Sequence, residues 1–162
     1  MKNLILVRHA KSSWDHDVND DERPLAKRGT SDAHLVSKEF SFQPFQADMV
    51  FSSHANRALT TCKIFLENLK ISDNLLVISH KLYDFRGENV IDFIKSVDDR
   101  LDDVMIFGHN YAFTSVSNHF GSLFIDNLPT CGLVWIQFDA NSWKDVKKGT
   151  TKLIIRPKDL KN

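Results

Sequence analysis

The sequence predicts an α/β fold, a three-layer sandwich in which helices cover both faces of a mainly parallel central sheet. Short apolar runs rich in β-branched residues alternate along the chain with longer segments of helical spacing, an order typical of such sandwiches. The chain has 162 residues, so we expect residues 1–162 to form a single domain. Hydrophobic residues make up 42% and charged residues 26%, which indicates a globular protein and not a disordered chain.

Six short apolar runs predict the strands of the sheet. Each is rich in Val, Ile, Leu or Phe and is bounded by polar or turn-forming residues. The runs are Leu4–Val7, Met49–Phe51, Leu75–Ile78, Val104–Phe107, Leu133–Phe138 and Leu153–Ile155. A turn over Asn141–Thr150 can join the last two strands, so we expect one antiparallel edge strand.

Four segments between these runs predict helices, because their apolar residues recur every three or four positions. Thr30 or Ser31 can cap the first helix, which we expect to continue to about Phe42. The other three are expected over Asn56–Leu69, Asn89–Val97 and Tyr111–Phe120.

Charge and composition narrow the classes of partner. Lys plus Arg and Asp plus Glu both number 21, so no net charge favours nucleic acid or an anionic membrane, and we expect neither partner. No apolar segment is long enough to cross a bilayer, and no secretory signal pattern is present, so we expect a cytoplasmic protein. Cys62 and Cys131 lie in apolar settings that favour two reduced, packed thiols. The oligomeric state is left open.

Three polar motifs follow three of the predicted strands. They are Arg8-His9-Ala10, the segment from Ser53 to Arg57, and Gly108-His109-Asn110. The carboxyl ends of parallel strands meet at one edge of an α/β sheet, where such folds build their ligand sites. We therefore expect the three motifs to converge on one anion site.

The residue types in these motifs indicate phosphate chemistry. A neutral His9 can attack phosphorus and carry the phosphoryl group covalently. Arg8, Arg57 and His109 would then surround the phosphoryl oxygens and stabilise the charge of the transition state. We expect Arg57 in the first turn of its helix, where free backbone N–H groups also favour an anion.

The remaining polar features predict no further ligand. None of the other histidines shows zinc spacing, so we expect neither metal nor cofactor; they are His16, His34, His54, His80 and His119. The irregular stretch Lys11–Gly29 begins directly after His9, and we expect it to pass over or beside the site. The acidic residues within it, Asp15 to Glu22, are interpreted as a solvated loop.

Taken together, these motifs resemble those of the histidine phosphatase superfamily, which has the phosphoglycerate mutase-like fold. The family pattern of Arg-His-Gly, Ser-x-x-x-Arg-Ala-x-x-Thr and Gly-His-Asn is matched here at Arg8, Ser53 and Gly108. Pro24-Leu25 and the residues after it look like another family segment. The short length and the opening Arg-His-Ala-Lys-Ser-Ser-Trp are most similar to the small SixA-type phosphohistidine phosphatases.

This resemblance implies a cofactor-independent phosphatase with catalytic residues His9, Arg8, Arg57, His109 and Asp84. Asn110 would join Arg8, Arg57 and His109 in binding the substrate. Asp84 is the preferred general acid, and Glu88 is the alternative. The chain departs from the family at two positions, because Ala10 replaces the usual glycine and Asp15 stands where many members carry a phosphate-binding asparagine.

Three functions remain open at this point. The favoured one is removal of phosphate from phosphohistidine in a protein, because an imidazole leaving group needs less help from an acid than an alkoxide does. The second is hydrolysis of a small phosphate ester. The third, motivated by the departures at Ala10 and Asp15, is a catalytically silent phosphate-binding regulatory module.

Overall fold

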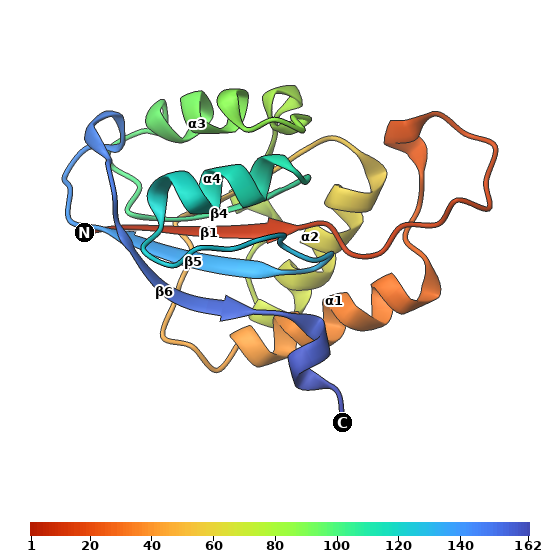
Figure 1. Ribbon diagram of the computed structural model, residues 1–162. Helices are drawn as coiled ribbons and strands as arrows, with labels where there is room; N and C mark the ends of the chain where they lie inside the picture. The colour runs from red at the N-terminus through yellow and green to blue at the C-terminus, as the bar shows by residue number, and fades with distance from the viewer.

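A computed structural model describes residues 1–162 and shows one six-stranded sheet between two pairs of helices (Figure 1). The helices are α1 (Lys27–Phe40), α2 (Asn56–Leu69), α3 (Glu88–Lys95) and α4 (Ala112–Phe120). The strands are β1 (Lys2–Arg8), β2 (Met49–Ser52), β3 (Leu76–Ile78), β4 (Asp103–Gly108), β5 (Leu133–Phe138) and β6 (Thr150–Ile155). The predicted three-layer α/β sandwich is confirmed, and every helix and strand expected from the sequence is present.

The strand order explains how distant motifs meet. The order is β3-β2-β4-β1-β5-β6, and the pairs β3–β2, β2–β4 and β4–β1 are all parallel. Strand β5 is antiparallel to both β1 and β6. The expected antiparallel strand is therefore present, but it lies one position in from the edge, which β6 forms. Strands β2, β4 and β1 are neighbours, and their carboxyl ends therefore lie side by side.

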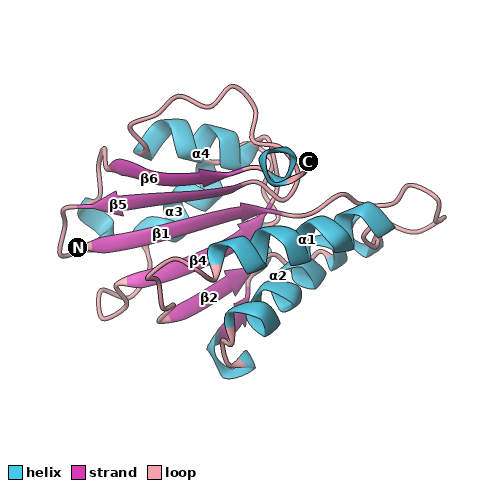
Figure 2. Cartoon of the chain, turned by 90° about the horizontal axis from the view of Figure 1, so that it is seen from below, coloured by secondary structure: helices cyan, strands magenta, loops and turns pink.

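Alternation of side chains along the strands builds a core on each face of the sheet. On β1, Leu4 and Leu6 pack with α3 and α4, whereas Ile5 and Val7 pack with α1 and α2. All four side chains are fully buried, and burial of one such side chain stabilises the fold by about 1.5–3 kcal/mol. Figure 2 shows the two helix pairs on opposite sides of the sheet. Both cores hold the central strands rigidly and so fix the positions of the residues that follow them.

Helix α1 begins earlier than expected. Its first residue is Lys27, its N-cap is Ala26, and no side chain caps it, so the prediction of a cap at Thr30 or Ser31 was wrong. The reason is a backbone contact, since an ideal Cβ on Gly29 would lie only 2.1 Å from the carbonyl oxygen of Lys11. Glycine lets the first turn of α1 pack directly against the start of the β1–α1 loop.

Two further sequence expectations concern compartment and thiols. None of the helices combines the length and the apolar character needed to cross a membrane. Cys62 and Cys131 are free and buried, as expected. Burial raises the pKa of the Cys62 thiol to about 12 and also raises the pKa of Cys131, so both behave as packed apolar groups.

Candidate active site

The three predicted motifs meet at the carboxyl ends of β2, β4 and β1. In the sheet, Arg8 is paired with Gly108, and Ser52 is paired with Phe107, so the three strands end at nearly the same level. His9 and His109 are the next residues along β1 and β4. Their ring centroids are 5.3 Å apart. The register of the sheet thus brings together two histidines that are a hundred residues apart in the sequence.

His9 is oriented by its own backbone neighbour. Its Nδ1 lies 2.7 Å from the carbonyl oxygen of Ala10. Because a carbonyl oxygen can only accept a hydrogen bond, we assign the ring proton to Nδ1, which leaves the lone pair on Nε2. The residue is 7% exposed, so one edge of the ring remains reachable. This is the arrangement that a nucleophilic imidazole requires.

The surroundings of His9 keep it neutral. Burial lowers the pKa of its imidazole from 6.5 to about 4. The hydrogen bond to Ala10 opposes this shift, while the positive charges of Arg57, Arg8 and Arg23 add to it. His9 is therefore unprotonated at neutral pH, and it lies in a field that attracts anions.

Two guanidinium groups act on His9, that of the half-buried Arg8 and that of the buried Arg57. Arg8 donates a hydrogen bond from Nη1 to the carbonyl oxygen of Leu128 at 2.7 Å, and burial lowers its pKa. Arg57 lies in the first turn of α2, and its side chain is 2% exposed. The Nε atoms of both arginines are buried and have no hydrogen-bond partner within the protein.

His109 completes the group that we call the His9 cluster, which consists of Arg8, His9, Arg57 and His109. Burial is the main cause that lowers the pKa of His109 to about 2, and the charges of His9 and Arg57 contribute to this shift. Its Nε2 lies 2.8 Å from the hydroxyl oxygen of Ser53, which also accepts a hydrogen bond from the Ala55 backbone N–H. The Ser53 hydroxyl proton has no other acceptor, so we assign this hydroxyl as donor to Nε2, which leaves the ring proton on Nδ1. That Nδ1 is also buried and has no partner.

Three buried nitrogens in this cluster therefore lack a protein partner, namely Arg8 Nε, Arg57 Nε and His109 Nδ1. They come from β1, from α2 and from the turn after β4. A buried N–H group without an acceptor costs about 1–3 kcal/mol, so such groups are uncommon outside binding sites. All three are N–H groups that can donate a hydrogen bond to an oxygen of an anionic ligand.

Four residues that shape this site were not predicted as site residues from the sequence, namely Asp20, Arg23, Tyr83 and Ser53. Asp20 accepts hydrogen bonds from Arg57, Arg23 and the Tyr83 hydroxyl. The ring of Tyr83 stands edge-on to His109, with centroids 5.2 Å apart. Ser53 orients His109, whereas the sequence indicated it only as the first residue of a motif. Asp20 lies in the stretch that was interpreted as a solvated loop, and only the adjacent Arg23-Pro24-Leu25 pattern hinted otherwise.

The carboxylate of Asp84 is occupied by backbone hydrogen bonds. Its Oδ1 accepts from the Arg86 N–H at 3.1 Å, and its Oδ2 accepts from Gly87 at 3.0 Å and from Val90 at 3.1 Å. Gly87 itself has a φ of 113°, a conformation that favours glycine, and it begins α3. Asp84 therefore caps α3, which argues against its expected role as proton donor. The alternative, Glu88, is an exposed residue in the first turn of α3.

Asn110 is likewise engaged within the fold. Its Oδ1 accepts hydrogen bonds from the backbone N–H and the hydroxyl of Thr114, at 3.0 and 2.7 Å. Its Nδ2 donates to Asn127 Oδ1 at 2.8 Å. The side chain thus caps the start of α4 and ties it to the α4–β5 loop, which argues against its expected role in substrate binding.

The two departures from the family pattern do not disturb the cluster. Ala10 is fully buried, has no positive φ, and donates its backbone N–H to Thr61 at 3.0 Å. Its methyl group packs in the core between the sheet and the α1–α2 pair, so the freedom of glycine is not needed at this position. Asp15 is exposed and forms no ion pair, and its negative charge is not part of the His9 cluster.

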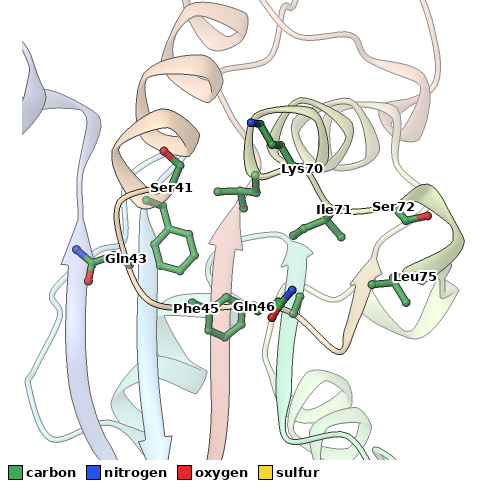
Figure 3. Close-up of a pocket in the computed structure, with 11 residues that line it drawn as sticks. Ser41, Gln43, Phe45, Gln46, Lys70, Ile71, Ser72 and Leu75 are labelled. Atoms are coloured by element: carbon green, nitrogen blue, oxygen red, sulfur yellow. The ribbon is translucent and has the colours of Figure 1, made fainter.

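A separate hollow lies at the opposite end of the strands. It has a volume of about 290 Å³ and lies between the ends of α1 and α2 (Figure 3). Its lining includes Ser41, Gln43, Phe45 and Ile71, together with one charged residue, Lys70. No residue of the His9 cluster lines it, and it plays no part in the chemistry described here.

Comparison with solved structures establishes the fold independently. The chain superimposes on the putative phosphohistidine phosphatase SixA from Agrobacterium tumefaciens with a TM-score of 0.81 and 21% identity, covering 96% of this chain and 98% of that one. It also matches the protein histidine phosphatase SixA complexed with tungstate, with a TM-score of 0.83 and 16% identity, covering 98% and 99%. The SixA-like, phosphoglycerate mutase-like fold is therefore confirmed.

Sequence comparison supplies the family. An uncharacterised protein of Mycobacterium tuberculosis is 27% identical over 158 residues, which cover 91% of this chain and 96% of that protein. The model of the histidine phosphatase superfamily, branch 1, matches residues 4–84, a segment that contains Arg8, His9 and Arg57. By this match, and with the corresponding residues gathered at one edge of the sheet, the chain belongs to the histidine phosphatase superfamily.

Proposed function

We propose that the protein is a phosphatase in which His9 takes the phosphoryl group from the substrate and passes it to water. The observation that supports this most directly is the 2.7 Å contact between His9 Nδ1 and the Ala10 carbonyl oxygen, which leaves Nε2 as a neutral base. Such an imidazole, close to the guanidinium groups of Arg8 and Arg57, has the properties of a nucleophile for phosphorus.

The proposed reaction has two displacement steps. In the first, the His9 Nε2 lone pair forms a bond to phosphorus while the bond from phosphorus to the leaving group breaks, and the leaving group keeps that electron pair. In the second, a water oxygen bonds to phosphorus, the bond from phosphorus to Nε2 breaks, and one water proton passes to solvent or to the released phosphate. Arg8, Arg57 and His109 stabilise the phosphoryl oxygens in both transition states.

The favoured substrate is phosphohistidine in a protein, so the proposed partner is a phosphorylated protein. An alkoxide leaving group needs a proton from a nearby acid, whereas the imidazole of phosphohistidine can already carry its proton near neutral pH. Asp84, the acid expected from the resemblance, accepts three backbone hydrogen bonds instead. A site whose expected acid is engaged by the backbone suits a nitrogen leaving group better than it suits a sugar phosphate. The proposed steps use only side chains of this chain.

The experiment that tests this substrate choice compares kcat/KM for a phosphohistidine peptide with values for a panel of sugar and nucleotide phosphates. We expect the phosphohistidine peptide to be hydrolysed fastest. The variant His9→Ala should lose this activity, while His119→Ala should keep it, because His119 is exposed at the end of α4 that lies away from the cluster. Faster turnover of a small ester would assign the protein to the second class.

A catalytically silent module is the remaining candidate, because the site lacks an evident proton donor. Such a module would bind an oxyanion at the His9 cluster but release no phosphate from any substrate of the panel. Oxyanion binding without turnover would therefore replace the phosphatase proposal with a regulatory one.

A further inference from the structure

Asp20, in the loop between β1 and α1, accepts two hydrogen bonds from the guanidinium group of Arg57. Arg57 Nη1 donates to the Asp20 carbonyl oxygen at 2.6 Å, and Nη2 donates to Asp20 Oδ2 at 3.0 Å. The same carboxylate accepts hydrogen bonds from Arg23 Nε at 3.2 Å and from the Tyr83 hydroxyl. One carboxylate therefore links the loop, α2 and the segment that precedes α3.

The charge and burial of Arg57 and Asp20 show which of the two side chains depends on the other for its position. The Arg57 side chain is 2% exposed, and Asp20 is the only carboxylate with which it forms an ion pair. The Asp20 side chain is 47% exposed, so it can stay solvated without Arg57. A buried guanidinium that loses its counter-ion is unfavourable and tends to move. Asp20 thus controls the orientation of Arg57 more than Arg57 controls that of Asp20.

The contacts with Asp20 leave the Nε–H of Arg57 without a partner. Asp20 holds the terminal nitrogens, while Nε is buried and has no partner within the protein. The charge of Arg57 acts on both His9 and His109, so its guanidinium group lies close to the two rings. Asp20 forms no hydrogen bond with Arg8, His9 or His109. The Asp20 charge nevertheless reaches His109, whose pKa it raises.

We propose that Asp20 is a positioning residue that fixes Arg57 in the orientation that binds the phosphoryl group. The inference rests on the proposed function, since it assigns a structural partner to one of the phosphate ligands. It also makes the β1–α1 loop a working part of the active site. The competing interpretation is that Asp20 is an internal anion that competes with phosphate for Arg57.

The two interpretations predict opposite changes in oxyanion affinity. Tungstate binding to the 162-residue protein, measured by calorimetry, distinguishes them without relying on turnover. If Asp20 positions Arg57, Asp20→Ala should weaken tungstate binding by roughly tenfold or more, since hydrogen bonds to charged groups are the stronger ones. Asp20→Asn, which keeps one acceptor oxygen, should fall between Asp20→Ala and the wild type. If Asp20 competes with the ligand, both variants should bind more tightly.

The matched control is Asp21→Asn. This change removes the same charge one residue away, and the Asp21 carboxylate contacts His54 Nε2 at 3.2 Å and not Arg57. Its tungstate affinity should stay within about twofold of the wild-type value, because a partly exposed charge is well screened. Unfolding curves of all variants verify that they are folded.

A double-mutant cycle separates positioning from a general loss of structure. In an Arg57→Ala background, Asp20→Ala should cause no further loss of tungstate binding, because the residue through which Asp20 acts is already absent. Unchanged or tighter binding by Asp20→Ala, or an additive loss in the double variant, would overturn the positioning role while leaving the phosphatase proposal intact. Absence of tungstate binding by the wild type would overturn both.

Discussion

The rings of His9 and His109 lie 5.3 Å apart, with their planes inclined at 55°. Burial is the main cause of the lowered pKa of each ring, which falls to about 4 for His9 and about 2 for His109. Two imidazoles at this distance cannot both carry a proton at low cost. Their proximity, together with the nearby guanidinium groups, keeps one available as nucleophile and the other as hydrogen-bond donor.

The first prediction concerns the pH dependence of stability. In the unfolded chain both histidines titrate near the ordinary pKa of 6.5, whereas in the folded chain they stay neutral to much lower pH. Below about pH 6.5 the unfolded state therefore binds more protons, and the free energy of unfolding falls as the pH is lowered. Each ring contributes a slope of up to about 1.4 kcal/mol per pH unit down to its folded pKa. Urea unfolding at several pH values between 7.5 and 4.5 measures the slope.

The matched variant for this test is the double substitution His9→Asn and His109→Asn. It should show a shallower pH dependence than the wild type over the same range. An identical slope in the two proteins would mean that the two rings titrate normally in the folded state.

The second prediction concerns the two arginines of the His9 cluster. Arg8→Ala and Arg57→Ala should each lower kcat by about 10²–10³, the usual cost of removing one preorganised donor from a transition state. Arg57→Lys should restore little of this loss, because an ammonium group lacks the planar fork and the Nε–H that the site uses. Arg100→Ala is the control, since this exposed arginine pairs only with Asp98. Steady-state kinetics with the best substrate provide the measurement, and full activity of either catalytic variant would contradict the assignment.

The third prediction separates a helix cap from a general acid at Asp84. Asp84→Asn should lower the free energy of unfolding by about 1–2 kcal/mol, because an amide cannot accept all three backbone hydrogen bonds. Turnover of phosphohistidine by the folded variant should stay within a few-fold of wild type. A general acid would instead show a loss that grows as the leaving group of the substrate becomes more basic. Glu88→Gln, measured with the same substrates, tests the alternative acid.

The fourth prediction concerns the contact between Gly29 and Lys11. Gly→Ala within a helix is ordinarily stabilising by about 0.5–1 kcal/mol. At Gly29 the added Cβ would lie 2.1 Å from the Lys11 carbonyl oxygen, so we expect destabilisation of about 1–3 kcal/mol. Ser31→Ala, at an exposed position of the same helix, should be neutral or slightly stabilising. Urea unfolding of the two variants decides between these signs.

Hydrophobic periodicity predicted the fold well, because it depends only on residues within the same strand or helix. Alternation along β1 places Leu4 and Leu6 in one core and Ile5 and Val7 in the other, and the same rule holds for each buried strand. The start of α1 was wrong because it depends on a contact between Gly29 and Lys11, which lie eighteen positions apart. No capping rule applied to one segment can detect such a contact.

Some residues of the site could be predicted from the local sequence, and others could not. Arg8, His9 and His109 could be placed from strand ends alone, since sheet register brings them together. Asp20 could not, because its role depends on Arg57, Arg23 and Tyr83, which come from three different segments. The expected roles of Asp84 and Asn110 followed from their positions in motifs. The hydrogen bonds that engage both side chains as caps are visible only in three dimensions.

The central claim is that His9 becomes phosphorylated, and chemical trapping of the enzyme during turnover tests it most directly. Wild-type protein quenched while hydrolysing a labelled phosphohistidine peptide should carry phosphate that is lost in acid, is stable in base and maps to His9. The variant His9→Ala should carry none and should release no phosphate. Turnover by the wild type without any acid-labile phosphate, or retained turnover by His9→Ala, would contradict the account.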